Sequence, residues 1–210
     1  MVMKTLAHRW PTAVGLIAAV AIFLESPDRA EVALVAAIAA TCYVAAATFA
    51  LPWMAWAWIP IGFVVVAAGR LVGLHPLVAT GVTAVALVAV GLLRTRTRPG
   101  VTLETAGLLL YGALAVLALL LAPAVGLVVV ALTLIAHGAW DLWHLRRHRE
   151  LVSPSLAEAC VALDVPLGLA VLVVALVFKE HRRARPGAPA ARPPRGCSPR
   201  AWRTPRRRGW

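Results

Sequence analysis

The feature that most constrains this 210-residue chain is a succession of apolar stretches, each about as long as a membrane-spanning helix. A hydrocarbon core about 30 Å thick needs roughly 20 apolar residues in one helix, and 61% of this chain is hydrophobic against 14% charged. This composition excludes an ordinary soluble enzyme, a disordered chain and a disulfide-stapled secreted module. The lipid bilayer is therefore the first expected partner.

Prolines, glycines and charged residues divide the apolar sequence into seven predicted helices. The basic loop 94–100 is the clearest break, and Pro123 divides an apolar run of about 40 residues that is too long for one span. Ser26 is expected to cap the second helix, with Asp28 in its first turn. The predicted fold class is all-α, a polytopic transmembrane helix bundle of about seven spans: 10–24, 26–50, 52–72, 76–93, 102–121, 124–145 and 154–178.

The formal charge of +12 is concentrated at the C-terminal end of the chain. Residues 1–178 carry ten Lys/Arg and eight Asp/Glu, whereas residues 179–210 carry eleven and one. We therefore predict a transmembrane helical domain over 1–178 and a disordered Arg/Pro-rich tail over 179–210. Anionic lipid head groups and non-specific nucleic-acid contact both suit this charge, and a solvated tail without a partner is the third interpretation. No specific nucleic-acid partner is expected.

The loops favour one orientation of a multi-pass protein in the plasma membrane. With seven spans, the N-terminus and the three loops on its side hold eight Lys/Arg, against two on the other side, Arg29 and Arg70. The positive-inside rule then predicts a cytoplasmic N-terminus. The basic tail contradicts this orientation, because it leaves the membrane on the opposite side.

Ionisable residues inside the predicted spans gather in the last two helices. Such residues are costly in lipid and mark either function or a buried pairing. His137, Asp141 and His144 share one face of their helix, because about 100° separates successive residues. His137 and Asp164 lie at the same depth, roughly 13 Å from the loop that joins the two helices. We therefore expect one buried cluster between these helices, formed by His137, Asp141, His144 and Asp164.

Other polar residues have structural explanations. Glu158 is expected to form a capping box with Ser155 at the start of the last helix. Glu104 suits the first turn of its helix, where a negative charge complements the helix dipole. Cys160 matches Asp141 in depth, but a lone cysteine in an apolar helix usually packs as a small hydrophobe. The three cysteines of the chain are too few and too scattered for a disulfide framework.

A motif block spans these residues: His137-x-x-Trp140-Asp141-x-x-His144, followed by Cys160-x-x-x-Asp164. It resembles the motif block of a family of multi-pass bacterial membrane proteins and covers about 30 of the 210 residues. Members of that family tend to have a second histidine after the one that matches position 144, where this chain has Leu145. No activity is assigned to the family, so the resemblance implies a membrane location rather than a chemistry. Membrane-embedded zinc hydrolases also take His and Asp ligands from several helices, which is an analogy only.

Three functions fit these residues. The first is an enzyme that holds a divalent metal, with zinc the best match to imidazole and carboxylate ligands, and hydrolyses a lipid-like amide or ester. The candidate metal ligands are His137, Asp141, His144 and Asp164, and the two aspartates are also the candidate catalytic residues. The second is a proton- or cation-coupled carrier. The third is a structural membrane protein whose polar cluster only locks two helices together.

Overall fold

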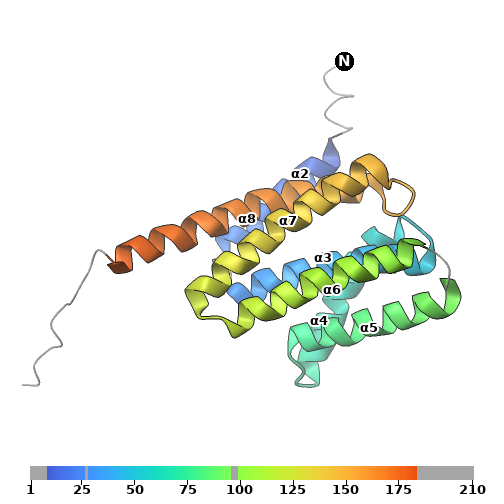
Figure 1. Cartoon of the computed structure of the whole chain (residues 1–210), viewed down its shortest axis with the longest axis horizontal. Helices are drawn as coiled ribbons and strands as arrows, with labels where there is room; N and C mark the ends of the chain where they lie inside the picture. The colour runs from blue at the N-terminus through green and yellow to red at the C-terminus, as the bar shows by residue number, and fades with distance from the viewer. Residues whose placement is uncertain (1–8, 27, 96–98, 184–210) are drawn as a thin grey trace, which may run out of the picture.

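The computed structural model describes residues 9–26, 28–95 and 99–183, and these residues form seven α-helices and no strand. The all-α fold predicted from the sequence is confirmed (Figure 1). The predicted tail lies outside the described residues, apart from the start that continues the last helix. The helices are α2 (Trp10–Leu24), α3 (Arg29–Phe49), α4 (Met54–Leu71), α5 (Pro76–Thr95), α6 (Pro99–Leu120), α7 (Pro123–Arg147) and α8 (Pro154–Arg183).

Three helix ends differ from the prediction by three residues or more. The N-cap of α3 is Asp28 rather than Ser26: its carboxylate accepts from the backbone of Ala30 and Glu31, and the Glu31 side chain completes a capping box. Helix α6 begins at Pro99, about one turn before the predicted start, because proline is favoured at the first helical position. Helix α8 continues past residue 178 to Arg183.

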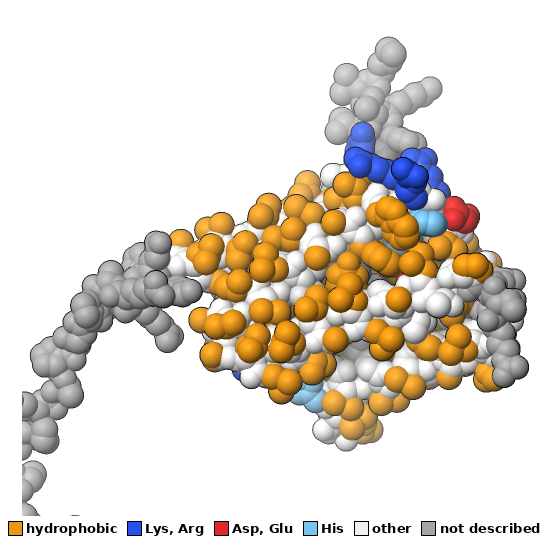
Figure 2. Space-filling model, in the orientation of Figure 1, with side chains coloured by type: hydrophobic (Ala, Val, Ile, Leu, Met, Phe, Trp, Pro, Cys, Tyr) orange, Lys and Arg blue, Asp and Glu red, His pale blue; other side chains and the backbone are white. Residues whose placement is uncertain are grey.

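Six of the seven helices are long and apolar enough to cross a membrane. Helix α2 has 15 residues and is shorter, about 22 Å at 1.5 Å per residue. Figure 2 shows hydrophobic side chains over most of the viewed face, with Lys and Arg gathered at one end. Exposed basic residues at helix ends include Arg9, which precedes α2, and the arginines in and beside the α7–α8 loop. The chain is therefore a multi-pass integral membrane protein.

The helices lie in layers, with α3 enclosed at the centre (Figure 1). Helix α8 packs between α2 and α7, while α3 packs against α4, α5, α6 and α7. Alanine-rich sequence suits the central position of α3, because small side chains let neighbouring helices approach closely. Polar groups that α3 carries on its enclosed faces are therefore sealed from lipid.

Helices α7 and α8 approach closely at two glycines, one on each helix. A Cβ atom on Gly138 would lie 2.6 Å from Val165 Cγ2, and one on Gly168 would lie 2.8 Å from the carbonyl oxygen of Ala131. Neither position has room for a larger residue without moving a helix. Gly138 directly follows His137 in the chain, so this approach places His137 against α8.

Candidate functional site

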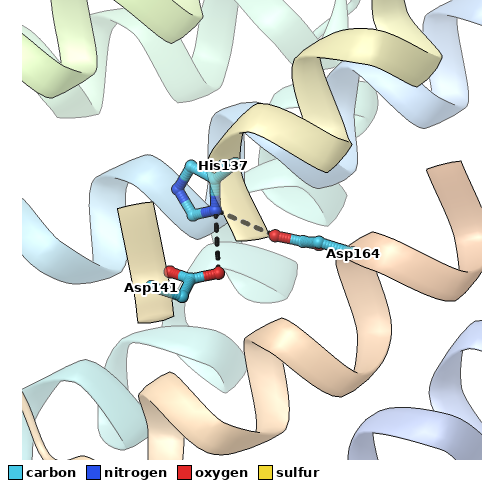
Figure 3. A group of neighbouring side chains, drawn as sticks. All are labelled: His137, Asp141 and Asp164. Carbon is cyan, nitrogen blue, oxygen red and sulfur yellow. Dashed lines mark hydrogen bonds and ion pairs between the residues drawn. The ribbon is translucent and has the colours of Figure 1, made fainter. Parts of the chain in front are cut away.

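Three side chains from α7 and α8 meet at the centre of the site (Figure 3). His137 Nδ1 lies 2.8 Å from Asp164 Oδ2 on α8 and 3.3 Å from Asp141 Oδ2, one turn along α7. The meeting of His137 and Asp164 was predicted from their equal depth and is confirmed. We call His137, Asp141 and Asp164 the His–Asp triad.

The third helix at the triad is α3, which contributes Tyr43. The hydroxyl of Tyr43 donates a hydrogen bond of 2.5 Å to Asp141 Oδ1. Both tyrosines of the chain lie edge-on to the His137 ring, with centroid distances of 5.8 Å for Tyr43 and 4.8 Å for Tyr111. Sequence reasoning missed these residues. A usable signal was present, because both tyrosines lie inside apolar spans rather than only at their ends.

The triad is sealed and yet incompletely bonded. Its members have exposed fractions of 1% or less. Among the described residues, Asp141 Oδ2 and Asp164 Oδ1 receive no hydrogen bond, whereas Asp164 Oδ2 is bonded to His137 Nδ1. An unpaired buried acceptor costs about 1–3 kcal/mol. The site therefore has two carboxylate oxygens that can still accept a hydrogen bond or bind a cation.

The charges of the triad are also unbalanced. Two carboxylates and one imidazolium carry a net charge of −1, and a neutral imidazole leaves −2. Tyr43 donates a hydrogen bond to Asp141 but adds no charge. A charge buried in a membrane domain is costly unless it is paired. The triad therefore requires either an additional proton or a cation.

His144 forms a separate pair, which corrects the expectation of a single four-residue cluster. Its Nε2 lies 2.7 Å from Glu104 Oε1 on α6, and its Nδ1 lies 3.0 Å from the carbonyl oxygen of Trp140. The Tyr43 ring lies edge-on to both His144 and His137. His144 was a candidate metal ligand, but both of its nitrogens are already bonded, and it is not part of the triad.

Glu104 is buried, with 1% of its surface exposed, and it is more than a first-turn partner of the helix dipole. Because α6 begins at Pro99, Glu104 lies in the second turn, on the side that faces α7. A separation of 2.7 Å between His144 and Glu104 requires a proton between them, so the pair as a whole is neutral. We call these two residues the His–Glu pair.

The remaining candidates lie elsewhere. The capping box predicted for Glu158 is wrong, since α8 begins at Pro154 and Ser155 is already helical. Glu158 instead accepts a hydrogen bond from Thr12 and contacts Arg9 beside α2. Cys160, which was matched with Asp141 by depth, lines an apolar cavity that Asp164 also lines, while Asp141 bonds to Tyr43.

The geometry of the triad suits a metal ion. One ligand atom from each member lies within 4.8 Å of the other two. Tetrahedral zinc with bonds of about 2.0–2.2 Å holds its ligand atoms about 3.3–3.6 Å apart. The distance from His137 Nδ1 to Asp141 Oδ2, 3.3 Å, falls in this range, and the 2.8 Å distance to Asp164 would widen slightly. Asp141 Oδ2, which receives no hydrogen bond from the described residues, is thus free to act as a ligand.

Comparisons of the chain with protein families, with curated proteins and with solved structures find no match. The resemblance of the motif block to bacterial membrane proteins stays a prediction from the sequence.

Proposed function

We propose that the protein is a metal-dependent membrane hydrolase in which the His–Asp triad holds a divalent cation, with zinc the best match. The observation that carries this proposal is the triad itself: three ligand atoms within 4.8 Å of one another, with unpaired carboxylate oxygens and a net negative charge. A divalent cation with a neutral imidazole and two carboxylates makes the site neutral. Neutrality matters here because the site is buried in the membrane domain.

His137, Asp141 and Asp164 would hold the ion and leave it open to a water molecule, and a bound zinc ion would supply the lowered pKa that makes such a water reactive. Of the two candidate aspartates, Asp164 is the one that could accept the proton of that water, since its Oδ1 has no hydrogen-bond donor and its Oδ2 faces His137, whereas Asp141 would use Oδ2 as a ligand and bonds to Tyr43 through Oδ1. A substrate must reach this site through the bilayer, so we propose a lipid-like amide or ester. Tyr43 fixes Asp141, in the way that outer hydrogen bonds orient metal ligands.

A proton- or cation-coupled carrier is the second candidate, because one bound proton also reduces the negative charge of the triad. Under that function, Asp141, His137 and Asp164 relay the proton. The structural alternative, a cluster that only locks helices, is favoured less, because such a cluster gains most when every polar group is satisfied.

Zinc content decides between these functions. The full chain, purified in detergent and equilibrated with zinc before removal of free metal, should retain about one ion per chain. The variant His137→Ala should lose it. The matched control His75→Ala changes an exposed histidine at the start of α5 and should keep it. A parent protein without zinc, or zinc retained in His137→Ala, would overturn the metal site and leave the carrier and the structural alternative.

We further propose that the protein resides in the plasma membrane, as the resemblance to bacterial membrane proteins implies. The suggested contact of the basic tail with anionic lipid also stays a proposal, since most of that tail lies outside the described residues. Vesicle binding of the full chain and of a chain ending at residue 183, compared at low and high salt, measures this contact.

A further inference from the structure

Helix α7 has a second face, which is turned away from the triad and toward lipid. Exposed side chains recur on this face at helical spacing and fall within an arc of about 100°. They are Leu132, Ala136, Ala139, Trp143, Arg146 and Arg147, and we call them the outer stripe of α7. His137 and Asp141 are buried on the other side of the helix. One helix therefore presents the triad inward and the outer stripe outward.

The outer stripe is apolar along its length and charged only at its end. Leu132 and Trp143 are 50% and 37% exposed, and the rise between them is about 16 Å at 1.5 Å per residue. One leaflet contributes about 15 Å, half of a hydrocarbon core of about 30 Å. An exposed indole suits the level of the lipid head groups. An acyl chain that lies along the stripe therefore places its head group at Arg146 and Arg147.

The two arginines at the end of the stripe are exposed, and neither forms an ion pair with a described residue. They lie in the last turn of α7, where a cation complements the helix dipole and keeps its own N–H groups free. Other arginines are engaged within the protein. Arg9 lies 3.4 Å from Glu158, and Arg29 donates to the carbonyl oxygen of Leu121 at the end of α6.

The charges of the α7–α8 loop do not cancel. Residues 146–150 hold three arginines and one glutamate, a net charge of +2 with His148 neutral. The glutamate, Glu150, lies 3.4 Å from the ring of His148, and Arg149 donates to the carbonyl oxygen of Leu145. Figure 2 shows Lys and Arg side chains gathered at one end of the viewed face. The loop therefore attracts an anion from its surroundings, and the bilayer provides anions as phospholipid head groups.

We propose that the outer stripe of α7 binds one anionic phospholipid, with an acyl chain along Leu132–Trp143 and the phosphate at Arg146 and Arg147. The planar guanidinium group matches phosphate oxygens in geometry and charge. A zwitterionic lipid offers the same chains, but its amine cancels the charge of its phosphate, so the net charge of the loop selects the anionic lipid. The site is distinct from the basic tail, because α8 begins beside this loop and ends about 45 Å from its own start.

The test uses the full chain in phosphatidylcholine nanodiscs with a trace of phosphatidylglycerol that carries a diazirine on one acyl chain. A phosphatidylcholine probe with the same chains is the reference, and mass spectrometry maps the labels. Each arginine near a membrane surface favours an anionic lipid about fivefold, so residues 132–143 should prefer the phosphatidylglycerol probe by roughly 25-fold. Equal labelling of these residues by both probes would overturn the proposal.

A pair of double variants locates the binding. Arg146→Gln with Arg147→Gln should lose most of the preference. The matched control, Arg70→Gln with Arg94→Gln, removes the same charge from exposed positions in the last turns of α4 and α5 and should keep it. All four side chains are exposed, so both double variants should unfold at the parental midpoint. An equal loss of preference in both would show that overall charge attracts the lipid, and it would contradict a site on α7.

A soluble competitor separates the lipid from its head group. Glycerophosphoglycerol, which is phosphatidylglycerol without its chains, should not displace the probe at millimolar concentration, because the stripe contributes the contact with the chain. Displacement would contradict a phospholipid as the occupant. None of these measurements involves a metal, so the lipid site and the proposed zinc site can fail separately.

Discussion

Helix α7 carries two buried histidines on one face, about 10 Å apart along the helix axis. The polar groups to which they belong differ in net charge. The His–Glu pair is neutral, and both ring nitrogens of His144 are bonded. The His–Asp triad has a surplus of negative charge and two carboxylate oxygens without donors. A histidine buried in a membrane helix is therefore not by itself a sign of a site.

The partners make the difference. One carboxylate with one imidazole forms a closed unit, which stabilises the contact between α6 and α7. Two carboxylates around one imidazole form a unit that needs a further positive charge. The comparison assigns ligand binding to the triad and helix packing to the pair, and variants at each can test the assignment.

The largest expected effect on stability comes from Glu104→Ala. Removing one partner of a buried pair leaves the other uncompensated, which costs about 3–5 kcal/mol in the free energy of unfolding. Unfolding in mixed detergent micelles measures this change. Replacing both residues, Glu104→Leu with His144→Leu, should recover most of it, because no buried polar group is then stranded. If Glu104→Ala removed zinc without loss of stability, the pair would belong to the metal site.

An intermediate effect is expected for Tyr43→Phe. The change removes the donor to Asp141 Oδ1 and adds another unpaired oxygen to the triad, at a cost of about 1–3 kcal/mol. Zinc affinity, measured by competition with a chelator, should fall about 10–100-fold. Tyr111→Phe is the matched control: its hydroxyl bonds to the carbonyl oxygen of Ala136 rather than to the triad. Equal losses of zinc affinity in both variants would contradict the role of Tyr43.

The smallest change in stability is expected for Asp164→Asn in the metal-free protein. The amide removes one negative charge and can still bond to His137, so the free energy of unfolding should change by less than about 1 kcal/mol. Zinc binding should nevertheless be lost. Glu104→Gln makes the same change in the neutral pair and should destabilise the protein more. The opposite order would show that the triad is balanced without a metal.

The sequence predicts the contact of His137 with Asp164 because the short α7–α8 loop makes these helices antiparallel neighbours. Equal distance from the loop then means equal depth, and the 3.6-residue period sets the face. No such constraint relates α7 to α3, so the contribution of Tyr43 depends on how helices distant in sequence pack. Helix α6 is joined to α7 by a short loop, but Glu104 and His144 lie at different distances from that loop, so the rule of equal depth does not predict their contact.

The helix ends also divide into those that the sequence predicts and those that it does not. Proline and loop signals place the seven segments correctly, and the differences amount to about a turn or less at most ends. One such difference concerns the His–Glu pair. Because α6 starts earlier than predicted, Glu104 lies in its second turn, in the buried region that faces His144. The distinction between the pair and the triad was therefore not accessible from the sequence.

The bond between Tyr43 and Asp141 joins residues 98 positions apart, and this has a consequence for biogenesis. Helix α7 carries two histidines, an aspartate and terminal arginines, which would make it a poor substrate for insertion as a solitary span. Helices α3 and α6 leave the ribosome earlier and hold Tyr43 and Glu104, the partners that those groups require. We therefore expect α7 to enter the membrane against helices already inserted, so that nascent chains lacking α3 would fail to retain it in the bilayer.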